Sequence, residues 1–76
     1  MGTMTSKVEQ FGDYTTYEFY EYGQTVGYVV VTRYGWNAFR IIHIEFNKNL
    51  VVAALKFLVG EYTKKGKALY GTQIPD

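Results

Sequence analysis

A strand that continues into one long amphipathic helix is the most constraining feature of this sequence. It spans Ala38–Gly66, with a strand predicted at Ala38–Phe46 and a helix at Asn47–Lys65. Within the helix, apolar side chains recur three or four positions apart, which is the spacing of one buried stripe. The members of this stripe are Leu50, Val51, Ala54, Leu55, Leu58 and Tyr62. A helix with a single apolar stripe needs an apolar surface to cover it, so the remaining residues must supply a sheet.

The two ends of this helix carry recognisable signals. Asn47 is the expected N-cap, with Asn49 as the alternative, because an Asn side chain accepts hydrogen bonds from the free N–H groups of a first turn. Gly66 is expected to end the helix, since glycine adopts the left-handed conformation there without strain. Gly60 is a poor helix former inside the helix. We interpret it as a point of close contact with a strand.

The residues before this unit predict two further strands. Tyr14–Tyr22 is rich in threonine and aromatic residues, and Thr25–Tyr34 has a β-branched run at its centre. Turn residues follow each strand, at Gly23-Gln24 and at Gly35-Trp36-Asn37. Because the run Val29–Thr32 is apolar on both faces, it predicts a central strand that is covered on both sides.

We therefore expect an α+β domain in the order β-β-β-α-β. The first three strands form an antiparallel meander, and the helix packs on one sheet face. The helix then leads to a C-terminal strand, Ala68–Ile74, which lies parallel to the third or to the first strand. Residues 8–76 make up this single domain, with Val8–Asp13 as a short lead-in and residues 1–7 as a flexible N-terminus. In the third strand we expect Ala38, Arg40, Ile42, Ile44 and Phe46 on one face and Phe39, Ile41, His43 and Glu45 on the other.

The composition excludes several classes of site. The 76 residues include no cysteine, which excludes disulfides and thiolate zinc sites. No apolar run approaches the roughly 20 residues of a membrane span, and residues 1–7 lack the apolar core of a secretion signal. We therefore expect a cytoplasmic protein without membrane contact, in the host cytoplasm if it is phage-encoded.

The net charge of +1 is unevenly distributed. Residues 1–46 carry three basic and five acidic side chains, whereas residues 47–76 carry five basic and two acidic ones. The basic excess at the helix end, within Lys56–Lys67, is weaker than the footprint of dedicated nucleic-acid-binding proteins. A nucleic-acid partner is therefore an alternative and not the favoured partner.

The run Phe-Tyr-Glu-Tyr-Gly-Gln-Thr-Val-Gly-Tyr-Val-Val-Val at Phe19–Val31 resembles the middle of GNAT-type N-acetyltransferases. Ile41–Phe46 then looks like their fourth strand, and residues 53–70 look like the helix and strand that follow. In that family a glycine-rich turn at the start of this helix binds the pyrophosphate of acetyl-CoA. The matching run here, Asn47–Ala53, has no glycine. The resemblance thus implies a relative that has lost its cofactor site, and we expect no cofactor and no catalytic, cofactor-binding or metal-binding residue.

His43 is the only histidine and lies close to Glu45 in the third strand. A general base or a metal ligand is conceivable at this position. No second histidine and no cysteine exists to complete a site. We therefore interpret His43 as a solvent-facing or interface residue, and we expect the protein not to be an enzyme.

Aromatic and arginine residues carry the strongest indication of binding. Fourteen of the 76 residues are Phe, Tyr or Trp, and Trp, Tyr and Arg dominate the energetics of protein interfaces. The candidate interaction residues are Arg33, Tyr34, Trp36 and Arg40 at the second hairpin and Tyr20, Tyr22 and Tyr28 in the sheet. In the alternative interpretation, Trp36 folds back and caps the core. The tyrosine face, which also includes Tyr14 and Tyr70, is suited equally to a homodimer interface.

We therefore predict a small protein-interaction module of the kind found among phage- or plasmid-encoded inhibitors and adaptors. This comparison is an analogy of size and composition. The first alternative is a nucleic-acid-binding protein that uses aromatic stacking and the basic helix end. The second is a degenerate GNAT-like acyltransferase.

Overall fold

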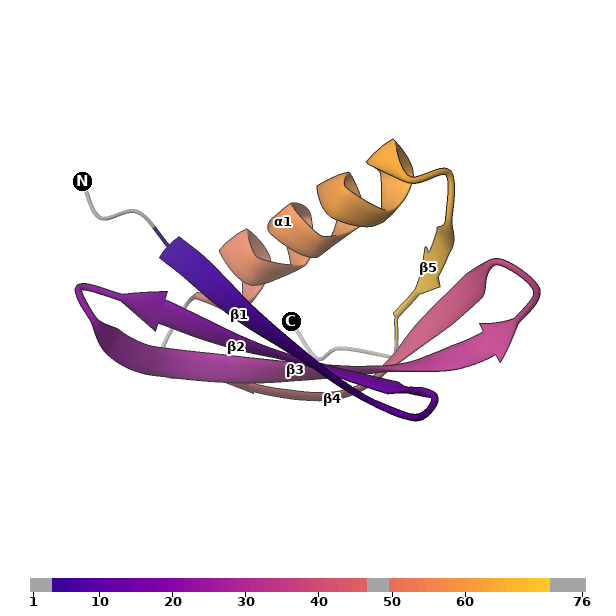
Figure 1. Ribbon diagram of the computed structural model, residues 1–76. Coiled ribbons are helices and arrows are strands. Elements are labelled where there is room, and N and C mark those ends of the chain that lie inside the picture. Colours follow the sequence, from indigo (N-terminus) through magenta and orange to yellow (C-terminus); the bar gives the residue numbers. More distant parts are fainter. Residues whose placement is uncertain (1–3, 47–49, 72–76) are drawn as a thin grey trace.

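The computed structural model describes residues 4–46 and 50–71, and it is a sheet of five strands with one helix on one face (Figure 1). The elements in chain order are β1 (Met4–Phe11), β2 (Tyr14–Glu21), β3 (Gln24–Gly35), β4 (Ala38–Phe46), α1 (Val51–Lys64) and β5 (Ala68–Tyr70). The strands lie in the sheet in the same order, β1-β2-β3-β4-β5. The predicted α+β class is confirmed, with four strands in the meander where three were expected.

The C-terminal strand is parallel to β4, the predicted third strand, which is one of the two positions that the crossover argument allowed. β5 pairs in parallel with β4, and Phe39 lies opposite Leu69 in the register. Two parallel strands need a connection that crosses over the sheet, and α1 is that connection. Ile74, the predicted end of this strand, lies outside the described residues.

The strand β1 is a correction to the sequence-based prediction. It begins at Met4, inside the segment expected to be a flexible N-terminus, and it includes most of the expected lead-in. Its eight residues pair with β2 in a continuous antiparallel register from Met4 opposite Glu21 to Phe11 opposite Tyr14. Both faces of β1 carry mostly polar side chains. The strand therefore has no hydrophobic periodicity by which the sequence could reveal it.

The helix α1 follows the predicted stripe, with Ala54, Leu58 and Tyr62 as its buried residues. Its C-terminus is the expected one. Gly66 has a φ of 69°, and the N–H of Lys67 donates to the carbonyl of Tyr62 at 2.9 Å, which is the hydrogen-bond pattern of a glycine-terminated helix.

At the N-terminus, Leu50 is the cap residue, and it makes no side-chain capping hydrogen bond. The expected caps Asn47 and Asn49 lie outside the described residues. The interpretation of Gly60 is wrong: it is exposed, and a β-carbon built on it would meet no atom within 4 Å. Gly60 therefore has no packing role among the described residues.

The core lies between α1 and the sheet face that it covers. Its buried members are Tyr17, Phe19, Val29, Val31, Ile41, Ala54, Leu58 and Tyr62. They come from β2, β3, β4 and α1, so the helix holds the three central strands together. Residues 4–46 and 50–71 thus form one thin hydrophobic core, as expected for a domain of this size.

The central strand β3 is covered on one face only, which corrects the prediction of a strand covered on both. Val29 and Val31 point towards α1 and are fully buried. Val30 and Tyr28 point to the other side, where Val30 is half-buried and Tyr28 is exposed. No element among residues 4–46 and 50–71 covers this second face, which we call the open face.

A β-bulge in β4 changes which residues share a face. Val30 lies opposite His43 and Val31 lies opposite Ile41, so Ile42 is the extra residue. Strict alternation predicted Ile44 and Phe46 on the face opposite Ile41, and this is wrong: all three pack with the core beneath α1. The bulge thus gives β4 a continuous apolar face and leaves His43 and Glu45 on the open face.

Asn37 joins the β3–β4 hairpin to the end of the helix. Its φ is 55°, its side-chain amide donates to the carbonyl of Gly66 at 2.8 Å, and its own carbonyl accepts from the N–H of Ala68 at 3.1 Å. Asparagine tolerates this left-handed conformation better than most residues. The hairpin tip is therefore anchored to the start of β5.

Candidate interaction surface

The open face is formed by alternate residues of all five strands. From the register, its members are Thr5, Lys7, Glu9 and Phe11 in β1, Tyr14, Thr16, Glu18 and Tyr20 in β2, Thr25, Tyr28, Val30 and Thr32 in β3, Arg40, His43 and Glu45 in β4, and Tyr70 in β5. Basic and acidic residues alternate with aromatic ones across it. No reactive group dominates this surface.

One end of the open face carries a packed group of aromatic and arginine side chains. The Cζ atom of Arg40 lies 5.3 Å from the centroid of the Tyr34 ring, and the rings of Tyr34 and Tyr70 meet edge to face at 5.5 Å. A guanidinium over an aromatic face is an attractive cation–π contact. Together with Trp36, these residues form the hairpin cluster.

Trp36 occupies the tip of the β3–β4 hairpin, at the right of Figure 1. Its exposed fraction is 89%. The alternative in which Trp36 caps the core is therefore wrong. The Trp36 side chain projects from a hairpin whose backbone is anchored by Asn37.

The structure separates two of the predicted site residues from the hairpin cluster. Arg33 lies opposite Phe39, which packs with the core, so Arg33 and Arg40 are on opposite sides of the sheet. Tyr22 is exposed in the β2–β3 turn, at the other end of β3 from Trp36 (Figure 1). Tyr34 and Arg40 are the predicted residues that the fold brings into contact, and Tyr70 joins them from the short β5. Trp36 lies two residues after Tyr34, in the turn of the same hairpin.

Tyr20 and Tyr28 lie around a carboxylate in the middle of the open face. The Thr25 hydroxyl donates to Glu18 at 2.7 Å, and the Tyr28 hydroxyl donates at 3.5 Å. Hydrogen bonds from Thr25 and Tyr20 lower the pKa of the Glu18 carboxyl, and the same interaction with Glu18 raises the pKa of Tyr20. Glu18 is therefore a hydrogen-bond acceptor among the aromatic side chains of the open face.

We expect this arrangement to give a measurable pH dependence. Because the folded-state pKa of Glu18 lies below its ordinary value of 4.5, its contribution to stability is present above that pH and is lost as the pH falls through the folded-state pKa. Replacing Thr25 by valine removes the first donor and should raise the Glu18 pKa in an NMR titration. An unchanged pKa in Thr25→Val would contradict the assignment of Thr25 as the main cause.

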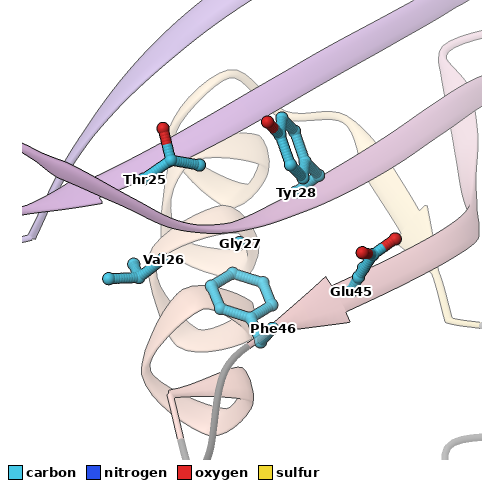
Figure 2. A pocket seen from close by; sticks show the side chains of 6 residues that line it. All are labelled: Thr25, Val26, Gly27, Tyr28, Glu45 and Phe46. Atoms are coloured by element: carbon cyan, nitrogen blue, oxygen red, sulfur yellow. The ribbon is translucent and has the colours of Figure 1, made fainter.

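A small cavity lies beside the paired residues at the start of β3 and the end of β4. It has a volume of about 70 Å³ and is lined by Thr25, Val26, Gly27, Tyr28, Glu45 and Phe46. Figure 2 shows the ring of Phe46 beside Gly27, in the space that a side chain at position 27 would need. The cavity holds no more than a few waters, so it is a packing feature and not a ligand site.

A second cavity, of about 170 Å³, lies on the helix side between β1, β2 and the end of α1. Its lining residues are Val8, Gln10, Thr15, Tyr17, Phe39, Tyr62, Lys65 and Lys67. The hydroxyls of Tyr17 and Tyr62 share a buried hydrogen bond of 2.8 Å. Burial, followed by this hydrogen bond, raises the pKa of Tyr17, which keeps the phenol protonated. The cavity wall thus combines the two tyrosine hydroxyls with the side chains of Lys65 and Lys67.

His43 is paired with a neighbouring glutamate of β4. Its Nε2 lies 3.3 Å from a carboxylate oxygen of Glu45, and both side chains are exposed on the open face. Among residues 4–46 and 50–71, no group of three or more His, Cys, Asp and Glu side chains is placed to hold a metal ion. The helix that the structure describes is also too short to cross a membrane.

Sequence reasoning missed two features of this surface. Tyr70 was assigned to a general tyrosine face, and its contact with Tyr34 depends on the three-residue pairing of β5 with β4. Glu18 was not recognised as a hydrogen-bonded centre, although its alternation with Tyr20 already placed the two on one face. Both features depend on the register between neighbouring strands, which the sequence alone does not give.

Comparison with known proteins gives this chain no relative. No family model matches it, and neither does any curated protein or solved structure. The parallel β4–α1–β5 unit agrees with the order implied by the acetyltransferase resemblance, but such units occur in many unrelated folds. The resemblance therefore stays a hypothesis, and the functional argument depends on the surface alone.

Proposed function

We propose that the protein is a binding module without enzymatic activity, and that it recognises another protein through the hairpin cluster and the adjoining part of the open face. The observation that carries this proposal is the exposure of Trp36, at 89%, beside the packed side chains of Tyr34, Arg40 and Tyr70. Trp, Tyr and Arg are the residues that most often dominate the binding energy of protein interfaces.

The chemistry of the cluster indicates the kind of partner. Trp36 offers a large apolar surface that would fill a pocket, and Arg40 offers guanidinium donors to a carboxylate at the rim of that pocket. Arg40 is already held over the Tyr34 ring. Fewer side-chain rotations are therefore lost when it binds, which favours affinity. The partner is expected to present an apolar pocket bordered by acidic residues.

The open face around the cluster has no strong excess of charge. Lys7 and Arg40 are balanced by the carboxylates of Glu9, Glu18 and Glu45 on the same face. Binding through such a surface depends mainly on apolar burial and on directed hydrogen bonds. The affinity is therefore expected to change little between low and high salt, unlike binding to a polyanion.

The test uses capture from a cell lysate followed by measurement with the purified partner. Trp36→Ala is expected to weaken the captured complex by at least about 30-fold, as at a binding hot spot. Tyr22→Ala is the matched control, because it removes another strongly exposed aromatic side chain at the other end of β3, and it is expected to change the affinity less than about threefold. Equal effects of both variants, or none from Trp36→Ala, would contradict the proposal.

Nucleic-acid binding is the second candidate, and the cavity beside Lys65 and Lys67 is the observation that favours it. One hydroxyl of the Tyr17–Tyr62 pair keeps a proton after the shared hydrogen bond is made, and the described residues provide no acceptor for it. A phosphate oxygen beside Lys65 and Lys67 would accept a hydrogen bond from that O–H group. Nuclease treatment of the lysate and a salt titration separate the two candidates, since loss of capture after nuclease supports this one.

A further inference from the structure

We propose that two copies of this chain pair through their β1 strands, in antiparallel register about a two-fold axis at Val8, to form one continuous ten-strand sheet. β1 is the first strand of the sheet and pairs only with β2, so its other side has no strand among the described residues. An edge of eight residues leaves backbone N–H and C=O groups available to another strand.

The hairpin geometry defines which backbone groups are available. Gly12 and Asp13 form a two-residue turn, Gly12 has a φ of 60°, and Phe11 lies opposite Tyr14. In a hairpin with a two-residue turn, the residues on either side of the turn, here Phe11 and Tyr14, form a hydrogen-bonded pair. Because hydrogen-bonded residues alternate in an antiparallel ladder, the outward-facing backbone groups belong to Met4, Ser6, Val8 and Gln10.

The alternation restricts the register of a symmetric pair. Outward-facing residues must lie opposite one another, so permitted registers differ by steps of two residues. In one of them Val8 lies opposite Val8 of the second copy, and Lys7 lies opposite Glu9 on both sides of the axis. The neighbouring registers place Lys7 opposite Lys7 or Glu9 opposite Glu9, which like-charge repulsion disfavours.

The charges therefore select one register. Lys7 also lies opposite Glu18 of its own β2 and contributes to lowering the pKa of that carboxyl. In the dimer, Lys7 would lie in a row between Glu18 and the second copy's Glu9. A lysine on an edge strand usually opposes pairing with other chains. In this dimer, Lys7 disfavours the neighbouring registers, and it is compatible with the register in which Val8 lies opposite Val8.

The apolar side chains of β1 are suited to the same pairing. Val8 is 53% exposed and Phe11 is 60% exposed. Val8 would meet its copy on the helix side of the sheet, and Phe11 would cover Thr5 of the second copy on the open face. Both copies would carry their helices on the same side, because residues that lie opposite each other point to the same face.

This pairing is independent of the proposed partner surface. The hairpin cluster includes residues of β4 and β5, at the opposite edge of the sheet from β1. A dimer through β1 therefore leaves both hairpin clusters accessible and makes the protein bivalent. The dimer can fail while the hairpin cluster binds, and the reverse also holds.

The experiment is a charge exchange followed by sedimentation equilibrium. An interface of one strand edge is small, so the protein is examined from about 10 µM to about 1 mM. Lys7→Glu and Glu9→Lys each replace two opposite-charge pairs by two like-charge pairs, and each is expected to weaken the dimer about tenfold. The double variant Lys7→Glu/Glu9→Lys recreates the pairs in reverse and is expected to restore the wild-type dissociation constant.

A fourth variant tests the backbone part of the interface. Val8→Pro removes an N–H that points away from β2, so circular dichroism should show an unchanged fold while the dimer is lost. If Val8→Pro does not fold, the dissociation constants of the three charge variants still test the proposed dimer. A wild-type protein that stays monomeric throughout the concentration range overturns the proposal. So does a double variant that remains as weak as the single variants, or a dimer that is lost in Trp36→Ala.

Discussion

Replacing Phe19 by alanine is expected to lower the free energy of unfolding by about 4 kcal/mol, as for a large aromatic side chain removed from a packed core. Phe19 is 1% exposed. Its ring lies 5.5 Å from that of Phe46 and 5.9 Å from that of Phe57, between centroids. One side chain of β2 thus contacts both β4 and α1, and its removal leaves a cavity between the sheet and the helix.

The effect is large relative to the total stability of so small a domain, which is expected to be only about 5–10 kcal/mol. Urea unfolding followed by circular dichroism measures it. Phe11→Ala is the matched control, because the Phe11 ring is exposed in the monomer. At a protein concentration below that at which the proposed dimer forms, it should change the free energy by less than about 0.5 kcal/mol. If the alanine variant does not fold, Phe19→Leu provides the measurement, at about 1.5 kcal/mol. Equal losses in Phe11→Ala and Phe19→Leu would contradict the proposed core.

The helix and its crossover were predictable because their signal is strong and local. Ala54, Leu58 and Tyr62 recur four positions apart, and Gly66 marks the end of the helix. The parallel pairing of β5 follows from the length of the connection. In α1, the apolar residues that form the sequence pattern are the same residues that pack in the core. The pattern therefore predicts the position of the helix.

Strand β1 was not predictable in this way, because an edge strand on a small sheet has no need of an apolar face. Met4 packs against the core, but Ser6 and Gln10 share its side of the strand. Lys7 and Glu9 occupy the other side. The pairing of β1 depends on its turn and on its backbone hydrogen bonds. Neither feature produces a pattern of alternating hydrophobic residues.

The faces of β4 were predicted incorrectly for a different reason. Alternation is correct on each side of Ile42 and fails across it, because the bulge inserts one residue without changing the composition of the strand. For the candidate site, the residue types predicted a binding hairpin. The contact between Arg40, Tyr34 and Tyr70 depends on register, and the exposure of Trp36 depends on tertiary packing. Neither can be obtained from local sequence.

Replacing Gly27 by alanine is expected to lower the free energy of unfolding by about 3 kcal/mol, at the upper end of the usual cost of overpacking. A β-carbon on Gly27 would lie 2.6 Å from the carbonyl oxygen of Glu45 and still closer to the ring of Phe46 (Figure 2). The ring can rotate away only by leaving the core that it packs against. The carbonyl can move only if the β3–β4 pairing shifts, so both neighbours resist the added methyl group.

Gly60→Ala is the matched control, because it is the same substitution at a glycine with open space around it. In an exposed helical position, alanine is favoured over glycine by about 1 kcal/mol, so this variant should be more stable than the wild type. The double variant Gly27→Ala/Phe46→Ala relieves the ring contact but keeps the contact with the Glu45 carbonyl. Its free energy of unfolding should therefore exceed the value expected from adding the two single losses. If Gly27→Ala were as stable as Gly60→Ala, the close packing of Phe46 over β3 would be wrong, and with it the placement of β4 against the helix.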